Sequence, residues 1–200
     1  MFTGIIEAIG KVIAIKEEGS NVNFTLSCPF TEELKVDQSL AHDGCCLTVM
    51  DILENGEYRV DAIKGTLIKT KLSDWEVGTE VNLERCVKIG GRLDGHMVQG
   101  HVDQVGRVEN IEAMDGSYLI DISYEPTDEF ITVPQGSITI NGISLTVARS
   151  RENGFSVAII PYTWEHTNMK NISIGQKVNL EFDIIGKYVT KLIAKSNAGN

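Results

Sequence analysis

The sequence predicts an all-β protein built from two tandem, homologous, six-stranded antiparallel barrels and one C-terminal amphipathic helix. Three observations predict this fold. The chain repeats itself once at a spacing of about a hundred residues, far longer than a solenoid unit, which indicates duplicated domains. Each half holds about six short alternating segments separated by turn residues, as in a small barrel. The last stretch changes to a helical period. Alternation alone leaves a flat sandwich open as the alternative to a barrel.

The repeat is strongest around Gly44–Val49, which recurs as Gly142–Val147, 98 residues further on. The longer segments 39–49 and 137–147 share five identities in eleven positions. Shorter matches pair Val81–Glu84 with Val178–Glu181, Thr70 with Thr167, and Gly4–Ile6 with Gly100–Val102. We therefore expect one barrel in residues 1–97, a second in 98–184, and a helix and tail in 185–200.

Composition excludes several classes of function. The 200 residues carry a net charge of −10 and are 42% hydrophobic, as expected for a soluble globular protein. The acidic balance disfavours nucleic acid and anionic membranes as partners, since phosphates would be repelled. The start of the chain has no basic region before an apolar run, and no segment is long and apolar enough to span a membrane. All four cysteines lie in the first half and none at the matching places of the second, which argues against a disulfide framework and for a reduced, cytoplasmic protein.

The first half predicts strands separated by turns. A β-rich run covers 4–16, and a turn at 17–21 leads to the clean alternation of Val22–Cys28, which Pro29 ends. Thr31 is the expected cap of a short helical turn. Asn55-Gly56 between two alternating runs is a strong hairpin signal. The remaining expected elements are strands at Ser39–Ala41, Cys46–Leu53, Tyr58–Ile63 and Glu80–Val87 and a brief helix at Thr66–Leu72.

The second half repeats this order, with Asn153-Gly154 in the place of Asn55-Gly56. The expected strands are 101–111, 117–124, 137–140, 144–150, 155–160 and 177–182. After them, apolar residues recur at intervals of three and four from Ile184 to Ile193, with lysines between, which predicts a single amphipathic helix. It has no counterpart in the first half. Self-association and packing across its own chain are both open as its role, and we expect a frayed tail from Ser196.

The repeat places different nucleophile-type side chains in one frame, Cys46 in the first copy and Ser144 in the second. Neighbouring residues on a strand face opposite ways, so one of Cys45 and Cys46 should face the core and the other the outside. A free cysteine is usually a small core residue. Serine is a poor core residue, however, so we expect Cys46 and Ser144 to point alike, toward something polar or reactive.

The link between the halves holds two of the four histidines, His96 and His101. Zinc binding is the weaker interpretation, because no third ligand stands at zinc spacing. Proton transfer near neutral pH is the better one, with backbone-bonded linker histidines as the structural alternative. Asp183 is either a site carboxylate or the N-cap of the last helix. We expect His42 and His166 to be surface or turn residues. The sequence has no glycine-rich nucleotide-binding motif.

Taken together, four motifs resemble the riboflavin synthase family over residues 1 to about 195. They are the Met-Phe-Thr-Gly-Ile start, the twice-repeated Asn/Asp-Gly-x-x-Leu-Thr-Val, the link Gly-His-x-x-x-Gly-His-Val-Asp, and Phe-Asp-x-Ile-Gly-Lys-Tyr. Each motif is short, but their joint order is specific. The resemblance implies Greek-key barrels with one lumazine-binding site each. It also implies a transferase of riboflavin biosynthesis, which dismutates two molecules of 6,7-dimethyl-8-ribityllumazine to riboflavin and 5-amino-6-ribitylaminouracil without cofactor or metal.

The family further implies a homotrimer held by the C-terminal helix, with the active site between the first barrel of one subunit and the second barrel of its neighbour. It allows an association with lumazine synthase. In this chemistry a base removes a proton from the acidic C7 methyl group of one lumazine, and a nucleophile adds to C7 of the other. The residues expected to share these roles are Cys46, Ser144, His101, His96 and Asp183, with water as an alternative nucleophile.

By position, the resemblance assigns two sets of substrate-binding residues. The first pocket would be lined by Gly4, Ile5, Ile6, Cys46, Leu47, Thr48, Asp61, Ala62, Ile63, Lys64, Gly65 and Thr66. The second would be lined by Gly100, His101, Val102, Gln135, Ser144, Leu145, Thr146, Ile159, Ile160, Pro161, Tyr162, Thr163 and Trp164. The chain departs from the family in having Gln135 for a common lysine, Gly65 for a glutamate, and bulkier side chains at Tyr162 and Trp164.

Two other functions fit the same fold. An antenna protein of the lumazine type would bind the heterocycle without converting it, but such relatives lack the Gly-His-x-x-x-Gly-His link and polar side chains in one pocket. An oligonucleotide-binding barrel is the third possibility, and the acidic charge argues against it. Fold alone does not decide among the three.

Overall fold

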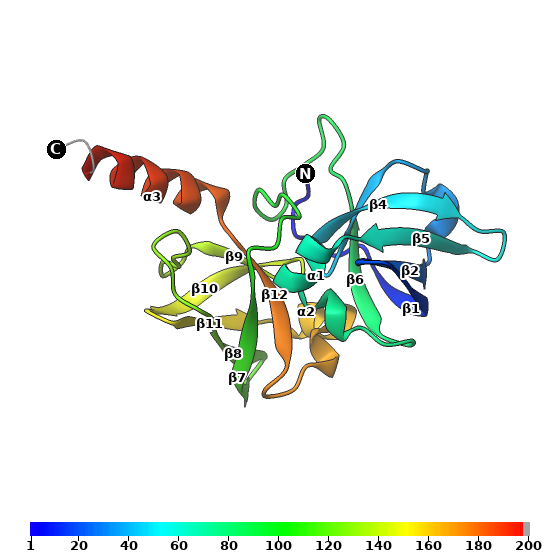
Figure 1. Cartoon of the computed structure of the whole chain (residues 1–200). Coiled ribbons are helices and arrows are strands. Elements are labelled where there is room, and N and C mark those ends of the chain that lie inside the picture. The colour runs from blue at the N-terminus through cyan, green and yellow to red at the C-terminus, as the bar shows by residue number, and fades with distance from the viewer. Residues whose placement is uncertain (198–200) are drawn as a thin grey trace.

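A computed structural model describes residues 1–197. It forms two closed six-stranded antiparallel barrels side by side, with a helix extending from the second (Figure 1). The first barrel consists of β1 Ala8–Glu18, β2 Asn21–Ser27, β3 Ser39–His42, β4 Cys45–Ile52, β5 Glu57–Ala62 and β6 Glu80–Arg85. The second consists of β7 Gln104–Met114, β8 Ser117–Ser123, β9 Ser137–Ile140, β10 Ile143–Arg151, β11 Gly154–Ile159 and β12 Lys177–Phe182.

Both barrels have one topology. The ring order is β1-β2-β5-β4-β3-β6 in the first, and the second follows the same order with its own strands. Since β3 pairs with both β4 and β6 while β2 pairs with β5, the connections are those of a Greek key. The barrel prediction is confirmed and the sandwich alternative is wrong. Register shifts occur at matching places, between Val12 and Ala14 and between Val108 and Asn110, so the copies share their bulges as well.

Strand alternation builds each core. In β4, Cys45, Leu47 and Val49 are buried, whereas the residues between them are more exposed. The inward residues of the first barrel form one apolar cluster and those of the second form another. Such clusters stabilise a barrel in proportion to the apolar area removed from water. The outward face of β4 and β10 is thereby left for other uses.

Short helices connect the strands. The expected helix at Thr66–Leu72 is two elements, α1 Lys64–Lys69 and η2 Lys71–Asp74, because Thr70 is extended between them. The second barrel has the equivalent α2 Pro161–His166, which strand alternation did not predict, and η3 Asn168–Asn171. In η1 Thr31–Glu33 the cap position belongs to Phe30, so the prediction of Thr31 as the cap is wrong. The Thr31 hydroxyl instead donates to the carbonyl of Cys28 at 2.9 Å.

The two barrels meet back to back at the turns before β4 and β10. Gly44 and Gly142 touch there, and a Cβ atom on Gly44 would come within 2.7 Å of the Gly142 nitrogen. Both glycines have φ near +80° (78° and 81°), where a side chain is disfavoured. Glycine is therefore required here both for the backbone conformation and for the close contact. Close backbone contact across an approximate two-fold axis follows.

Amide side chains complete this contact in a nearly symmetric way. Asn82 Nδ2 donates to the Asn141 carbonyl at 2.9 Å, and Asn179 Nδ2 donates to the Asp43 carbonyl at 2.9 Å. The symmetry is broken by charge. Lys71 Nζ lies 3.0 Å from Asp43 Oδ2, close enough for an ion pair although the angles do not make a hydrogen bond. The second barrel has the neutral Asn168 and Asn141 in these positions.

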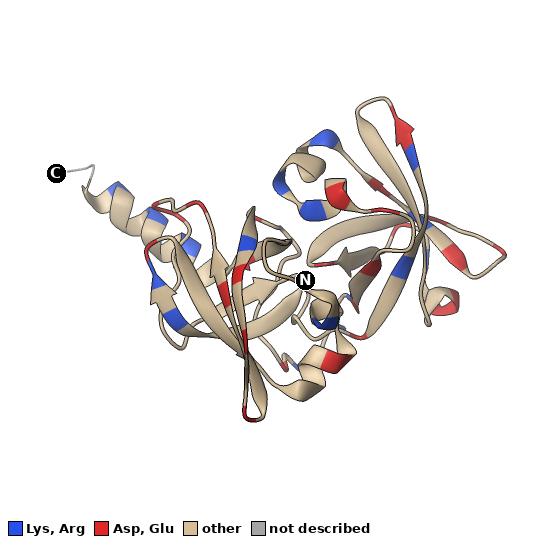
Figure 2. Cartoon of the chain, turned by 90° about the horizontal axis from the view of Figure 1, so that it is seen from below, with Lys and Arg blue, Asp and Glu red and all other residues tan. Residues whose placement is uncertain are grey.

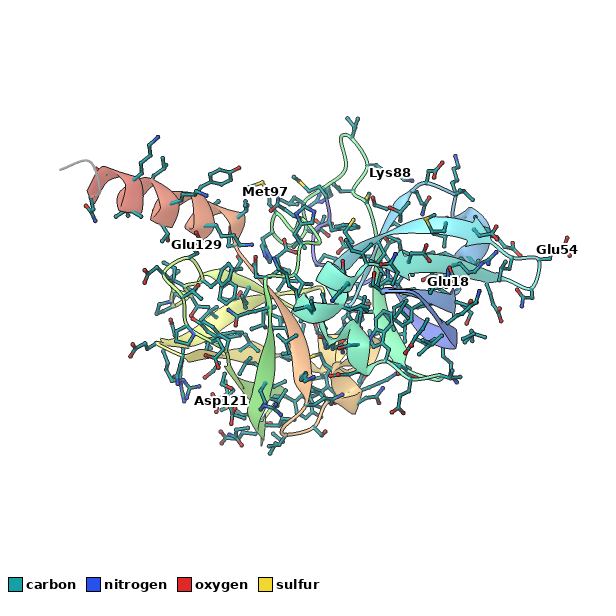
Figure 3. All side chains as sticks on the ribbon, viewed as in Figure 1. Glu18, Glu54, Lys88, Met97, Asp121 and Glu129 are labelled. Carbon is teal, nitrogen blue, oxygen red and sulfur yellow. The ribbon has the colours of Figure 1, made fainter. Side chains whose placement is uncertain are left out.

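The last helix, α3 Ile184–Asn197, projects away from both barrels (Figure 1). None of its residues is buried, and the side chains beyond its first turn surround it without meeting either barrel (Figure 3). The first turn does contact the chain, since Lys187 Nζ donates to Asp103 Oδ1 at 2.7 Å, but the rest of the described helix does not pack across its own chain. Ser196 and Asn197 belong to the helix, so the expected frayed tail is wrong for them, and 198–200 lie outside the described residues. Of the helices described, none has the length and apolar character needed to cross a membrane.

Candidate active site

Cys46 and Ser144 occupy equivalent positions on the outward face of β4 and β10. Cys46 is half-buried while its neighbour Cys45 is in the core, as strand alternation predicted. Cys46 pairs with Ala41, and Ser144 pairs with Thr139, across equivalent ladders. The expectation that the two side chains point alike is confirmed, but polar surroundings are found for Ser144 and not for Cys46, which packs against an apolar cluster.

Each of these strands is covered by a segment that belongs, by sequence, with the other barrel. The amide of Ser144 in the second barrel donates to the carbonyl of Gly4 at 2.8 Å. The amide of Cys46 in the first barrel donates to the carbonyl of Gly100 at 2.8 Å. We call residues 2–6 and 98–102 the crossing segments. Next to these contacts, Ile6 packs against the second core and Val102 against the first.

The crossing corrects the two predicted pockets. The family pattern grouped Gly4–Ile6 with Cys46 and Gly100–Val102 with Ser144. The structure instead places Gly4 on Ser144 and Gly100 on Cys46. The two segments also pair with each other, since Phe2 and Val98 exchange backbone hydrogen bonds of 2.7 and 3.1 Å. This pairing sends each segment across to the opposite barrel.

Glycine is required where the crossing segments touch the strands. Gly4 and Gly100 both have φ of 79°. A Cβ atom on Gly4 would stand 2.6 Å from Ser144 Cβ, and one on Gly100 would stand 2.6 Å from Cys46 Cβ. Both the conformation and the close approach therefore exclude other residues. The matched glycines mark two equivalent sites.

A hydroxyl and imidazole cluster surrounds Ser144. His96 Nδ1 lies 2.6 Å from Ser144 Oγ, and His96 Nε2 lies 3.2 Å from Thr139 Oγ1. With the proton on Nε2, the ring accepts from Ser144 and donates to Thr139, the arrangement of a base beside a hydroxyl. Burial lowers the pKa of His96, an effect that the nearby charge of Asp183 opposes. A neutral imidazole at neutral pH is the form that can take up a proton.

The surroundings of Cys46 are apolar by contrast. Phe2, Ala41 and Val98 form a small buried cluster, and Cys46 packs against it. Burial raises the pKa of the Cys46 thiol, which the contact with Ser39 only partly opposes. Reactivity of cysteine requires the thiolate. At neutral pH Cys46 is therefore a thiol, and within residues 1–197 no histidine or carboxylate hydrogen-bonds its Sγ as His96 does Ser144 Oγ.

The remaining candidates for catalysis differ in position. Asp183 caps α3, because its Oδ1 accepts from the amide of Ile185 at 3.0 Å, so the N-cap alternative is confirmed. His101 is exposed beside Gly100, and its amide donates to Glu181. His166 is exposed as predicted. The expectation that His42 is a surface residue is wrong, since it is fully buried and bonds Tyr58 Oη at 3.0 Å.

The predicted substrate-binding residues divide by exposure. Leu47, Ala62 and Ile159 have their side chains in the cores, so these three residues can meet a ligand through backbone groups. Leu145 is half-buried and packs against the second core. Exposed side chains that can meet a ligand are Ile5, Thr48, Asp61, Ile63, Lys64, Gln135, Thr146, Ile160, Pro161 and Tyr162, with Thr66, Thr163 and Trp164 half-buried. Gln135 adopts a φ of 65°, and its backbone N–H donates to the carbonyl of Val147.

Aromatic side chains distinguish the second barrel further, at Trp164, one of its predicted substrate-binding residues. Tyr118 and Trp164 stack with ring centroids 3.9 Å apart and planes 14° apart. The equivalent residues of the first barrel are Val22 and Leu67. A stacked pair of this kind presents a rigid apolar wall.

Neither site is a deep cavity in this chain. Concavities of about 770 and 650 Å³ lie elsewhere, and one of about 710 Å³ adjoins the sites, with Ile5, Ser39 and Glu84 in its lining; none of the three is lined by Cys46 or Ser144. The two sites are thus open strand faces. Among residues 1–197 there is no group of three or more metal-ligating side chains placed to hold a metal ion. Figure 2 shows acidic residues spread over both barrels, and α3 carries only basic charges.

Sequence reasoning missed several residues of these sites. Thr139 and Phe2 contact the site residues, and Glu84 and Glu181 hold the crossing segments. The glutamates had a signal in the repeated Val-Asn-Leu-Glu, and Phe2 had one in the Met-Phe-Thr-Gly-Ile start. Thr139 had none, because its contact depends on how the link between the barrels folds.

Comparisons with known proteins agree with this architecture. The profile of the family described as "Lumazine binding domain" matches twice, at residues 3–86 and 99–183. A riboflavin synthase of Bacillus subtilis (strain 168) is 37% identical over 198 residues, covering 98% of this chain and 92% of that protein. A riboflavin synthase of Mycobacterium tuberculosis (strain H37Rv) is 36% identical over 197 residues, covering 96% and 98%.

Solved structures show the same fold. A crystal structure of LumP complexed with 6,7-dimethyl-8-(1'-D-ribityl) lumazine has a TM-score of 0.81 at 24% identity and covers 90% of this chain and 98% of that one. A complex of LumP with riboflavin has a TM-score of 0.82 at 23% identity, covering 91% and 99%. At these identities the likeness concerns the fold alone.

Proposed function

This chain belongs to the riboflavin synthase family, with two lumazine-binding domains, and on that premise we propose how its two sites carry out the family's reaction. The enzyme dismutates two molecules of 6,7-dimethyl-8-ribityllumazine into riboflavin and 5-amino-6-ribitylaminouracil. One substrate molecule gives a four-carbon unit to the other, so the products account for all atoms and the reaction uses no cofactor. Each barrel, as one domain, binds one substrate molecule.

The observation that carries the proposal is the pair of equivalent but unequal sites. A reaction between two copies of one molecule needs two similar binding sites, and a donor and an acceptor need different surroundings. The crossing segments make the sites equivalent, whereas Ser144 and Cys46 make them unequal. Fixing both reactants replaces a bimolecular encounter by an effectively unimolecular step, which lowers the barrier by roughly 7–11 kcal/mol.

We assign the proton chemistry to the second site. His96 is the base, since its Nδ1 is within hydrogen-bonding distance of Ser144 Oγ. Ser144, or a water that its hydroxyl orients, is the nucleophile for C7 of the bound lumazine. Asp183 supports the imidazolium that forms when His96 takes the proton. Cys46 and the exposed His101 contact the partner lumazine at the first site.

Because each site is an open strand face, a second copy of the chain completes the active site in this proposal. The first barrel of one subunit faces the second barrel of the next, and α3 holds a homotrimer together. The support is the exposed apolar side of α3, where Tyr188 and Leu192 are each 66% exposed. The proposal also includes a cytoplasmic location and leaves room for an association with lumazine synthase.

The decisive experiment is turnover by the purified protein. Incubation with 6,7-dimethyl-8-ribityllumazine should yield one riboflavin for every two lumazines consumed, measured by absorbance and by chromatography of both products. A stable fluorescent complex without conversion would instead support a lumazine-binding antenna protein. A salt-sensitive shift of DNA in a gel would support the nucleic-acid alternative.

The role of α3 has its own test. Truncation after Asp183 should give monomers with little activity, because the helix supplies the contact between copies and the sites stay open without it. Sedimentation velocity measures the oligomeric state and the lumazine assay measures the activity. A truncated protein that is still an active trimer would contradict this part of the proposal.

A further inference from the structure

Two buried glutamates occupy equivalent positions at the ends of β6 and β12, and the catalytic proposal uses neither of them. Glu84 is 4% exposed and Glu181 is 3% exposed. A buried carboxylate is costly unless hydrogen-bond donors surround it. The donors around these two residues therefore show what each of them is for.

Both glutamates hold crossing segments. Glu84 accepts from the Thr3 amide at 2.6 Å, the Thr3 hydroxyl at 2.7 Å and the Gly4 amide at 2.9 Å. Glu181 accepts from the amides of Gln99, Gly100 and His101 at 2.6, 2.9 and 2.9 Å. In each case both carboxylate oxygens are used and three donors converge.

Each glutamate acts on the barrel to which it does not belong. Glu84 is part of the first barrel, but the segment it holds delivers the Gly4 carbonyl to Ser144 of the second barrel. Glu181 is part of the second barrel, but its segment delivers the Gly100 carbonyl to Cys46 of the first. The chain thus contains two reciprocal supports, related by the same approximate two-fold axis as the barrels.

We propose that Glu84 and Glu181 are positioning residues that act across the two barrels: Glu84 shapes the substrate site at Ser144, and Glu181 shapes the substrate site at Cys46. This inference rests on the proposed function, because it takes these two faces as the substrate sites. It adds that neither lumazine-binding barrel has a complete site without a carboxylate from the other barrel of the same chain.

The chemistry of the contacts requires a carboxylate. An ionised glutamate only accepts hydrogen bonds, and here all three donors point at it. Glutamine has the same shape but carries an NH₂ group in place of one carboxylate oxygen. That NH₂ group would face a backbone N–H of the crossing segment, so two donors would oppose each other with no acceptor between them. Burial raises the pKa of both carboxyl groups, while the donated hydrogen bonds oppose that effect. The Glu→Gln substitution is therefore a small change in volume with a large change in the support.

The test needs one fluorescent reporter for each site. The chain has two tryptophans, Trp75 in the first core and Trp164, which packs against the second core and is one of the residues predicted to line the second site. In a Trp75→Phe background, quenching of Trp164 by riboflavin reports binding at the second site. A matched reporter for the first site combines Trp75→Phe, Trp164→Leu and Leu67→Trp, because Leu67 is the counterpart of Trp164.

Glu84→Gln and Glu181→Gln are then placed in both reporter backgrounds, and riboflavin is titrated into each protein. Glu84→Gln should raise the dissociation constant about tenfold at the second-site reporter and less than about twofold at the first. Glu181→Gln should show the reverse. The matched control is Glu80→Gln, which lies on β6 near Glu84 but bonds Asn171 and not a crossing segment, and should change neither constant.

The outcomes separate the two levels of inference. If riboflavin quenches neither reporter before the glutamates are changed, the proposed function is wrong. If it quenches both, but each Glu→Gln change weakens the site of its own barrel or both sites equally, the cross-barrel role is overturned. Thr3→Val removes one donor to Glu84 without touching a core. It provides the second variant if Glu84→Gln does not fold, and it should weaken only the second site.

Discussion

The first and second barrels share one backbone, and they differ in where each places its polar groups. Strand order, bulges and the glycines at the crossing segments are the same in both. The first barrel has a polar pair inside, His42 with Tyr58, and an apolar cluster beside Cys46. In the second, the inside positions are Ile140 and Phe155, and the polar cluster lies beside Ser144.

The comparison teaches that duplication conserved the frame and left the side chains free to separate their roles. Backbone hydrogen bonds fix the ring of strands in both copies, and matched glycines and glutamates hold the crossing segments. Side chains at equivalent positions then decide whether a site can transfer protons. These equivalences also suggest the experiments, because the residue at a position in one barrel can be introduced at the equivalent position of the other.

The largest effect should come from exchanging the two site residues. Ser144→Cys should reduce turnover by about 10²–10⁴-fold, since it replaces the hydroxyl that His96 contacts, and general acid–base catalysis contributes that much. Cys46→Ser should change turnover by less than about tenfold, because no base adjoins it. Rates of riboflavin formation at saturating lumazine measure both variants. Equal losses in the two would show that the sites do not divide the chemistry as proposed.

The next effect concerns acid. Burial lowers the pKa of His42 to about 4 from its ordinary 6.5, so the unfolded chain takes up this proton well before the folded barrel does. The unfolded state then binds more protons between these values, and stability decreases as the pH falls from about 6.5 to about 4. The shift corresponds to about 3 kcal/mol in the free energy of unfolding of the first barrel. The raised pKa values of Glu84 and Glu181 increase stability as the pH falls. Because each barrel holds one of these glutamates, they affect both barrels in the same direction.

Urea unfolding at pH 7 and pH 4.5, followed by Trp75 for the first barrel and Trp164 for the second, measures this difference. The matched control is the double variant His42→Ile with Tyr58→Phe, which gives the first barrel the residues of the second. It should remove most of the acid sensitivity that Trp75 reports. Acid sensitivity that persists in the double variant would assign the effect to other groups.

The smallest effect concerns the aromatic wall. Tyr118→Val and Trp164→Leu give the second barrel the residues of the first, Val22 and Leu67. A stacked pair contributes about 1 kcal/mol beyond the area it buries. We expect a coupling energy of that size in a double-mutant cycle of the two changes, measured from urea unfolding of the second barrel. Strictly additive effects would mean that the stack contributes only its burial.

Much of the fold was predictable because it depends on local pattern and on repetition. Alternation located most strands to within a few residues, and the duplicated Gly-x-x-Leu-Thr-Val frame placed Cys46 and Ser144 on one equivalent face. Where a residue had a distant partner, the pattern was insufficient. His42 was expected at the surface as a polar residue near a turn, but Tyr58, sixteen residues away, accommodates it in the core. The grouping of Gly4 with Cys46 was wrong for the same reason.

The sequence by itself determined two homologous β domains, an amphipathic C-terminal helix, and a serine and a cysteine in matching places. Only the tertiary structure decided which segment serves which site, which histidine meets Ser144, and which glutamates hold the crossing segments. The physical reason is the sequence separation over which each kind of interaction acts. Strand alternation reflects each residue's own preference for core or solvent, whereas the contacts of Glu84 and Glu181 join residues about eighty positions apart. Those contacts exist only once two complete barrels lie back to back.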